Sequence, residues 1–330
     1  MARLGVRLDP GLQFTSQEML ELVSLAEERE YETIWLPEGP SNVLIQLTAF
    51  ATATRHIKLG TGILPIFHRT PTLLAMSAGD LDVISHGRFI LGLGSGHHPL
   101  VRHGHGVPFR KPMARMRETV EIVRRLLRGE RVTYEGRVFK LQDASLGFTP
   151  VRPDTPIYVG ALGPQMIELA GEIADGVLLA FASSGYLQTA IEHLRRGAER
   201  AGRNPQDIDV ACYLSTAVVD DADKAWPVAR RQIARLLRLP FYRTYYAQNG
   251  FAEESDTISQ ALDRGDADAA VAAVSEAMQR ELAIVGSAEE CRREIEARRS
   301  LGLKLPVVTP FPVGDDPLRS FKATISAFSG

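Results

Sequence analysis

Short apolar runs of strand length alternate with segments of helical periodicity along almost the whole of this 330-residue chain. The strand-like runs are Leu4–Leu8, Thr33–Leu36, Ile57–Gly62, Phe89–Gly94, Ile157–Val159, Gly176–Ala180, one within Ile208–Val219, and Leu305–Thr309. Strands that alternate with helices build parallel sheets, and eight such units predict a (β/α)8 TIM barrel. A doubly wound sheet is the alternative, but it needs a glycine fingerprint after the first strand, where this chain has Leu8-Asp9-Pro10.

Two segments depart from this alternation. Residues 131–141, RVTYEGRVFKL, alternate in polarity around Glu135-Gly136 and predict a surface hairpin. Residues 220–280 are too long for one crossover, and their alanine-rich, charged sequence predicts a helical insertion after the seventh strand. We interpret residues 1–330 as a single barrel domain that carries these two additions.

Composition excludes several classes of partner. The net charge of −2 gives no reason to expect nucleic acid or an anionic membrane. No apolar run is long enough to span a bilayer, and the amino terminus has no apolar signal core. Cys212 and Cys291 lie far apart and outside any zinc-binding spacing, so we expect a reduced, cytoplasmic setting.

The segment Pro156–Ala182 has the order strand, glycine loop, helix, strand. Its loop, Gly160-Ala161-Leu162-Gly163-Pro164, combines small residues with a proline suited to the first helical turn. Glycines allow the backbone to approach an anion, and a helix N-terminus offers free N–H groups and a partial positive charge. The loop therefore predicts a phosphate-binding turn, with an ordinary βα turn as the alternative.

In a barrel of this kind the active site is built from loops at the carboxyl ends of the strands. That rule selects Arg7 and Asp9, residues 38–42, residues 62–68 and residues 95–105 as further candidates. The last loop holds four histidines, His97, His98, His103 and His105. A metal cluster is conceivable there, but the loop has no acidic or cysteine ligand, so we expect no metal site.

Several of these stretches together resemble one family. They are IWLPEGPSN (Ile34–Asn42), LGTGILPIFHRTP (Leu59–Pro71), GRFILGLGSG (Gly87–Gly96), PIYVGALGPQMIELAGEIADGVLL (Pro156–Leu179) and the tail Ile284–Phe328. Taken in order they are similar to the bacterial luciferase-like superfamily, and specifically to its coenzyme F420-dependent branch, the methylenetetrahydromethanopterin reductase family. The similarity covers almost the whole chain.

The resemblance implies a luciferase-like barrel that binds coenzyme F420 and moves hydride through its C5. It places the coenzyme's phosphate at Gly160–Pro164, that is at Gly160, Ala161, Leu162, Gly163 and Pro164. It also implies a bulge behind the deazaflavin ring at Gly62 and Ile63, joined by a cis peptide. Glu38, Ser95 and His97 are expected to line the ring and substrate side. A homodimer and a small-molecule substrate are further expectations from the family.

Departures from the family pattern limit the substrate assignment. Arg7 stands where the family reductase has an acid, and Glu38-Gly39 stands where an Asp-His pair is usual. His97 replaces an acid, so neither the pterin nor the sugar-phosphate activity of the family carries over. Glu38 and His97 are the candidate catalytic residues. His97 is either a replacement proton donor, because an imidazole suits general acid–base work near neutrality, or a side chain that shapes the substrate pocket.

Three functions remain open at this point. The first is an F420-dependent oxidoreductase, which transfers hydride between the deazaflavin and an unidentified small organic substrate. The second is a two-component monooxygenase of the same fold that uses FMN. The third is a barrel enzyme that binds phosphate ligands without redox chemistry. The sequence GALGP resembles the deazaflavin branch and favours the first.

Overall fold

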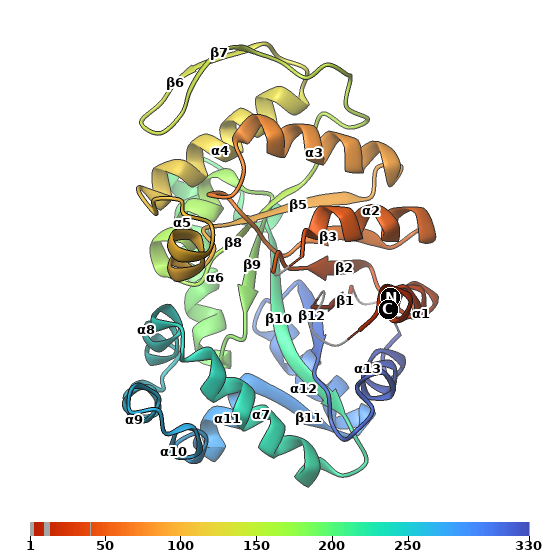
Figure 1. Ribbon diagram of the computed structural model, residues 1–330, viewed down its shortest axis with the longest axis vertical. Helices are drawn as coiled ribbons and strands as arrows, with labels where there is room; N and C mark the ends of the chain where they lie inside the picture. Colours follow the sequence, from red (N-terminus) through yellow and green to blue (C-terminus); the bar gives the residue numbers. More distant parts are fainter. Residues whose placement is uncertain (1–2, 10–13, 40, 330) are drawn as a thin grey trace.

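The computed structural model describes residues 3–9, 14–39 and 41–329, and within these ranges eight parallel strands close into a barrel (Figure 1). Closure depends on β10, which pairs with β9 on one side and β12 on the other, while β12 pairs with β1. The barrel strands are β1 (Gly5–Arg7), β2 (Thr33–Leu36), β3 (Lys58–Thr61), β5 (Phe89–Gly94), β8 (Ile157–Gly160), β9 (Gly176–Ala180), β10 (Asp209–Val218) and β12 (Leu305–Pro310). The predicted (β/α)8 barrel is confirmed.

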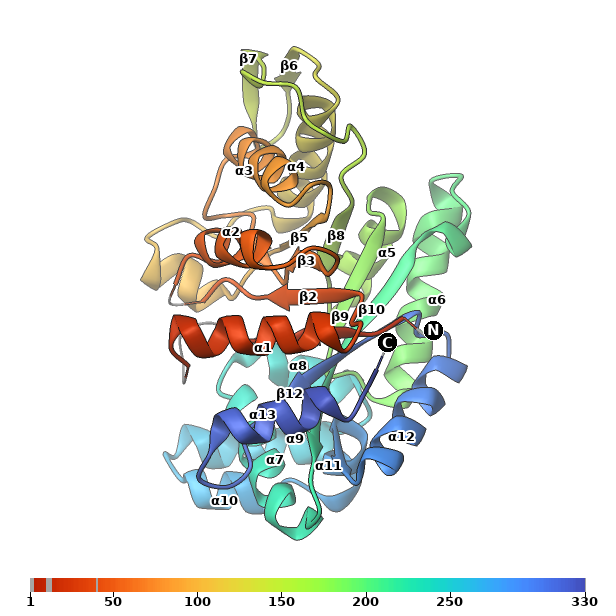
Figure 2. The same ribbon diagram turned by 90° about the vertical axis from the view of Figure 1, so that its right-hand side faces the viewer.

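Helices cover the outside of the barrel, and α1 and α13 lie side by side near the two chain ends (Figures 1 and 2). The covering helices are α1 (Ser16–Glu28), α2 (Val43–Ala53), α3 (Pro71–Ile84), α4 (Pro112–Leu127), α5 (Pro164–Ile173), α6 (Ser184–Arg200), α12 (Ala288–Ser300) and α13 (Pro317–Ser326). Helices α1 and α12 begin with reciprocal capping boxes, which satisfy backbone N–H groups that a helix start leaves free. Among the described residues, every helix is too short or too polar to cross a membrane.

The segment after β10 is helical, as predicted. It comprises α7 (Ala222–Leu236), α8 (Pro240–Gln248), α9 (Ala252–Asp263), α10 (Ala267–Ala272) and α11 (Glu276–Leu282), which gather beside the lower part of the barrel in Figures 1 and 2. A short strand that the sequence did not predict, β11 (Ala283–Gly286), follows directly and pairs with the second half of β10. Short elements elsewhere are β4 (Leu64–Pro65), the π-helix η1 (Leu100–Gly104) and the 3₁₀ helix η2 (Pro205–Asp207).

The predicted hairpin is formed by β6 (Val132–Glu135) and β7 (Lys140–Ala144), which pair antiparallel at the top of Figure 1. A buried carboxylate holds its turn. Glu118 of α4 accepts hydrogen bonds from the N–H groups of Arg137, Val138 and Phe139 at 2.8, 3.0 and 2.9 Å. Because Glu118 accepts from three backbone N–H groups, it fixes the turn to α4.

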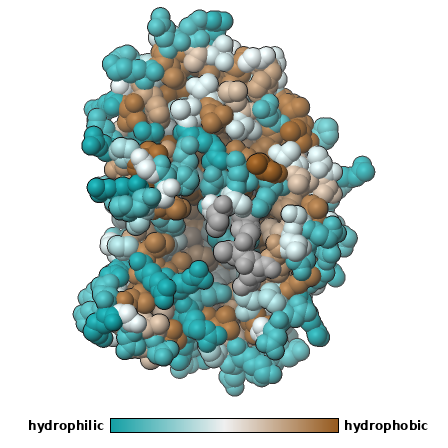
Figure 3. All heavy atoms as spheres, in the orientation of Figure 1, coloured by the Kyte–Doolittle hydropathy of each residue, from teal (hydrophilic) through white to brown (hydrophobic). Residues whose placement is uncertain are grey.

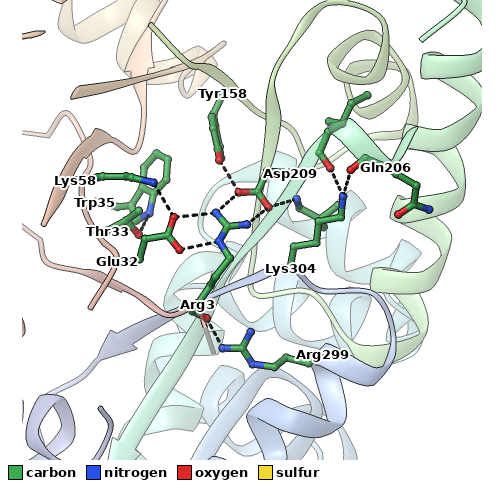
Figure 4. Close-up of polar contacts among 12 residues, drawn as sticks. Arg3, Glu32, Thr33, Trp35, Lys58, Tyr158, Gln206, Asp209, Arg299 and Lys304 are labelled. Atoms are coloured by element: carbon green, nitrogen blue, oxygen red, sulfur yellow. Dashed lines mark hydrogen bonds and ion pairs between the residues drawn. The ribbon is translucent and has the colours of Figure 1, made fainter. Parts of the chain in front are cut away.

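The amino-terminal end of the barrel is closed by an ionic network (Figure 4). The Arg3 guanidinium pairs with Glu32 and Asp209, each at 2.7 Å, and Lys58 pairs with Glu32 at 3.0 Å. The hydroxyl of Tyr158, whose ring lies inside the barrel, donates to Asp209 at 2.6 Å. With this end filled by side chains, the space for a ligand is left at the carboxyl-terminal end of the strands.

Arg88 joins the carboxyl-terminal ends of α2 and α3. Its side chain is almost fully buried, and its Nε donates to the carbonyl of Ser85 at 2.7 Å. Its two Nη atoms donate to the carbonyls of Ile57, Ala51 and Thr54 at 2.8, 2.8 and 3.0 Å. The last carbonyls of a helix carry a partial negative charge, so a guanidinium satisfies them and the two helices hold the cation in return.

Replacing Arg88 by methionine is expected to lower the free energy of unfolding by about 2–4 kcal/mol, because several buried carbonyls lose their donor. Arg88→Lys is expected to lose less stability than Arg88→Met but more than none. The single nitrogen of an ammonium cannot donate to the carbonyls of both helix ends at once, as the three nitrogens of a guanidinium do. Urea unfolding followed by circular dichroism measures both changes.

The matched control is Arg137→Met on the hairpin, where the arginine is exposed and its side chain donates no hydrogen bond within the described residues. This control is expected to change stability by no more than about 0.5 kcal/mol. Equal stability of the Arg88→Met and Arg137→Met variants would contradict the proposed contribution of Arg88.

Candidate functional site

A cavity of about 490 Å³ opens at the carboxyl-terminal end of the barrel strands. Figure 3 shows the molecule hollowed near the centre of the same view as Figure 1. All ten residues that the resemblance assigned to catalysis or to the coenzyme line this cavity: Glu38, Gly62, Ile63, Ser95, His97, Gly160, Ala161, Leu162, Gly163 and Pro164. Of the two strand-end candidates on β1, Arg7 lines it and Asp9 does not. The structure therefore brings the ten residues together from four different strand ends, while their individual roles remain predictions.

The peptide bond between Gly62 and Ile63 is cis, as the family resemblance implied. Three backbone groups of these two residues are engaged. The Gly62 N–H donates to the carbonyl of Leu36 at 2.6 Å, and the Gly62 carbonyl accepts from the Tyr213 hydroxyl at 3.0 Å. The Ile63 carbonyl accepts from the Glu38 N–H at 3.2 Å. A Cβ at Gly62 would lie 1.8 Å from the Tyr213 hydroxyl, so this position has room for glycine alone.

The side chain of Ile63 forms one wall of the cavity and lies against two glycines. A Cβ at Gly94, the last residue of β5, would lie 2.5 Å from Ile63 Cγ1. A Cβ at Gly160, the last residue of β8, would lie 2.7 Å from Ile63 Cγ2. Because both strand ends are glycine, Ile63 settles against the barrel and leaves a flat apolar surface toward the cavity.

The turn between β8 and α5 presents free backbone donors to the cavity. Gly163 is the N-cap of α5 with φ −95° and ψ 154°, and no side chain caps this helix. In the described structure, the N–H groups of Leu162, Gly163 and Gln165 donate to no protein acceptor. A Cβ added at Gly163 would meet nothing within 4 Å. The turn thus combines open space with three uncommitted donors at a helix N-terminus, which is the arrangement that binds a phosphate.

Glu38 lies at the end of β2 with both carboxylate oxygens engaged. Oε1 accepts from Arg69 Nη1 at 2.7 Å, and Oε2 accepts from the Val43 N–H at the start of α2 at 3.2 Å. Arg69 also donates to Asn42, the N-cap of the same helix, at 3.3 Å. These hydrogen bonds to both oxygens fix the carboxylate in place.

His97 lies half-buried in the cavity lining, and its ring centroid lies 6.0 Å from that of Tyr242. Burial lowers the pKa of His97 below its ordinary value. The cause is desolvation, which penalises the charged imidazolium. At neutral pH the ring is therefore neutral, and one of its nitrogens is free to accept a proton.

The other histidines of this region lie away from the predicted ligand surface. His68 and His105 stack with ring centroids 3.6 Å apart, and His98 meets Phe109 edge to face. Burial, together with the neighbouring His105, lowers the pKa of His68. Among the described residues, no group of three His, Cys, Asp or Glu side chains is placed to hold a metal ion.

Sequence reasoning missed five aromatic residues of the lining, one of which, Phe109, lies in the loop before α4. Phe181 directly follows β9, so inspection of every strand end would have found it. Tyr213 lies within β10, so finding it would have required inspection of residues inside the strands as well. Phe241 and Tyr242 come from α8 in the helical insertion, and no local pattern marks them as ligand-facing. Arg7, noted only as a strand-end candidate, also lines the cavity.

Comparison with known proteins gives relatives that match along nearly the whole chain. The 5,10-methylenetetrahydromethanopterin reductase of Archaeoglobus fulgidus is 32% identical over 97% of this chain and 96% of its own length. A putative coenzyme F420-dependent oxidoreductase of Mycobacterium tuberculosis is 30% identical over 93% of this chain and 94% of its own. The solved structure of the coenzyme F420-dependent tetrahydromethanopterin reductase from Methanopyrus kandleri matches with a TM-score of 0.87 and 29% identity, covering 99% of this chain and 98% of that one. The family model for luciferase-like monooxygenases matches residues 2–305, and the chain therefore belongs to the luciferase-like monooxygenase family.

Proposed function

We propose that this protein is a coenzyme F420-dependent oxidoreductase that transfers a hydride between the deazaflavin C5 and a small organic substrate. The observation that carries the proposal is the β8–α5 turn, whose free N–H groups open into the apolar cavity that Ile63 lines. The relatives described above, two of them named for this coenzyme, support the same conclusion.

The residues present fit the coenzyme in two respects. Leu162, Gly163 and Gln165 supply uncommitted donors for a phosphate, and the open space at Gly163 lets an anion reach the backbone. The surface formed by Gly62 and Ile63, with Ser95 nearby in the lining, suits one face of a planar ring. When bound, the coenzyme supplies the ring carbon that gives or accepts the hydride, and the protein orients it and excludes competing reactions.

We assign different tasks to the two ionisable candidates. Glu38, held by Arg69 and by the start of α2, fixes the loop after β2 against the Ile63 carbonyl. His97, neutral because burial lowers its pKa, accepts or returns the substrate proton that accompanies hydride transfer. A two-component monooxygenase that uses FMN is the second candidate, because the matching family model describes monooxygenases and the phosphate turn would serve FMN as well.

We also propose that residues 1–330 act as one barrel domain and that two copies associate through α2 and α3. Helix α2, VLIQLTAFATA, has no charged residue, yet Ile45 on it is 70% exposed. Leu73 and Met76 on the neighbouring α3 are 46% and 44% exposed. Helices that are apolar on their outer as well as their inner face are usually covered, and a second copy of the same surface would cover this one.

The coenzyme placement predicts that Gly163→Asp weakens F420 binding by about tenfold or more, because it adds like charge beside the phosphate. Gly163 has an ordinary backbone conformation and its Cβ would meet nothing within 4 Å, so the variant is expected to fold normally. Coenzyme fluorescence during titration measures the affinity, and FMN titrated in parallel tests the second candidate.

Gly147→Asp is the matched control, since this exposed loop glycine also has open space around its Cβ. It is expected to bind the coenzyme as the parent protein does. If Gly163→Asp binds F420 as tightly as the parent protein does, the phosphate does not bind at the β8–α5 turn.

In the direction in which His97 accepts the proton, we expect a rate that rises with pH as the imidazole loses its proton, at a pH below about 6.5. This limb of the pH–rate profile is expected to disappear in His97→Gln. The same lowered pKa affects stability, because the unfolded chain takes up a proton below about pH 6.5 while folded His97 does not. Stability attributable to His97 is therefore present above this pH and is lost as the pH falls.

The predicted effect on stability can be checked without any substrate. The free energy of unfolding is measured for the parent and for His97→Gln between pH 7.5 and 5.5. The parent is expected to lose more stability than the variant over this range. Superimposable pH–rate profiles would leave His97 as a residue that only shapes the pocket.

The proposed association predicts that Ile45→Lys and Met76→Lys convert a dimer into a monomer, because each buries a charge at the interface. Sedimentation velocity at several protein concentrations distinguishes the two states. Gln188→Lys on the exposed face of α6 is the control and is expected to stay dimeric. A monomeric parent protein, or dimeric lysine variants, would count against association through this face.

A further inference from the structure

We propose that Arg7 selects substrates that carry a carboxylate beside an apolar or aromatic group. The inference rests on the proposed function and extends it to the class of substrate. Arg7 is the last residue of β1, its side chain is 15% exposed, and it lines the cavity. A guanidinium binds a carboxylate through two parallel N–H donors, which is why arginine recognises this group better than lysine does.

Within the part of the chain that the structure describes, most of the hydrogen-bonding capacity of Arg7 is uncommitted. One Nη donates to Asp9 at 2.6 Å, and this is the sole hydrogen bond of the side chain to a described residue. Its Nε is buried without an acceptor in the described structure. A guanidinium has five N–H donors, so with one on Asp9 and the buried Nε set aside, about three on the two Nη atoms remain for a ligand.

The plane of the guanidinium is fixed by an aromatic ring. Arg7 Cζ lies 5.0 Å from the ring centroid of Tyr213, whose hydroxyl donates to the carbonyl of Gly62. Tyr213 is thus held at both its ring and its hydroxyl, and it positions Arg7 relative to the proposed ring surface. A cation held in advance loses little conformational freedom when it binds an anion.

Charges elsewhere in the cavity leave Arg7 as the group that attracts an anion. Among the described lining residues Arg7 is the one arginine or lysine, and Glu38 is the one carboxylate. Glu38 is neutralised by Arg69 at 2.7 Å. Asp9, the partner of Arg7, is 44% exposed, so water screens its charge more than that of Arg7. His97 is neutral at neutral pH because burial lowers its pKa.

The remainder of the lining suits an organic group. Phe181, Phe241 and Tyr242 contribute aromatic surface, and Leu100 and Met113 contribute aliphatic surface. A pocket that joins one oriented cation to apolar walls binds a molecule with a single acidic end.

The coenzyme also carries acidic groups, but the barrel order separates them from Arg7. Around the closed sheet β8 lies four strands from β1, so the phosphate turn and Arg7 stand on opposite sides of the mouth. An anion at Arg7 is therefore assigned to the substrate. A carboxylate at Arg7 could come from the coenzyme or from the substrate. The experiment therefore measures the binding of a small carboxylate and the binding of the coenzyme separately.

Benzoate and its neutral isostere benzamide are suitable probes. Calorimetric titration into the full-length protein saturated with oxidised F420 is expected to show benzoate binding about 10- to 100-fold more tightly, the factor for charge-assisted hydrogen bonds. This preference is expected to vanish in Arg7→Gln and to fall in Arg7→Lys, which keeps the charge but loses the fork. Asp9→Asn is expected to act in the opposite direction, because it removes the competing carboxylate and should tighten benzoate binding.

Arg131→Gln on the exposed hairpin controls for a general loss of charge and is expected to keep the preference. Thermal melting shows whether each variant is folded. If Arg7→Gln does not fold, the benzoate affinities of Arg7→Lys and Asp9→Asn test the role of Arg7 instead. Equal binding of benzoate and benzamide by the parent would overturn the inference, as would a preference that survives in folded Arg7→Gln. A loss of F420 affinity in Arg7→Gln would assign the anion to the coenzyme and likewise overturn it. Failure of the parent to bind F420 at all would instead defeat the proposed function, and benzoate titrated into the protein alone would still test Arg7.

Discussion

The mouth of this barrel depends on how closely the segment Gly62–Ile63 approaches the neighbouring strands. Ile63 lies against Gly94 and Gly160 so tightly that a Cβ on either glycine would come within 2.7 Å of its side chain. On the other side, the Tyr213 hydroxyl bonds to the Gly62 carbonyl and excludes any side chain at position 62. A larger residue at Gly94 or Gly160 would push Ile63 into the cavity and remove the surface on which the proposed ring binds. The glycines at the ends of β5 and β8 therefore serve the ligand surface through packing, apart from any role in turning the chain.

Much of the barrel was predictable because its strands are buried on both faces. The runs Thr33–Leu36 and Phe89–Gly94 are continuous apolar segments, and their predicted bounds coincide with β2 and β5. Strand β11 was not predicted, because its four residues follow α11 without a break and cannot be told from a helix end by periodicity. The same limit applies to β4, whose two residues, Leu64-Pro65, are shorter than any pattern that marks a strand.

The candidate site was predictable where it follows a strand end and unpredictable where it depends on contacts distant in the sequence. The phosphate turn at Gly160–Pro164 and the position of Glu38 follow from the strand-end rule and from resemblance. The partner of Glu38, Arg69, lies 31 residues further on, and its contact with the carboxylate depends on how the two loops fold together. Tyr242 enters from an insertion whose sequence shows amphipathic helices, and such a pattern does not say which turn faces a ligand.

Two arginine–carboxylate pairs determine the charge of the cavity, and they are arranged in opposite senses. At the end of β2 the carboxylate of Glu38 lines the cavity and its partner Arg69 is not among the described lining residues. At the end of β1, the adjacent strand, the guanidinium of Arg7 lines the cavity and its partner Asp9 is the more exposed member. An anionic substrate near Arg7 would be repelled by an unpaired carboxylate on the neighbouring strand, and Arg69 removes that repulsion. Arg69 thus matters for the proposed selectivity without touching the substrate, because it makes the charge of Arg7 the one that a ligand experiences.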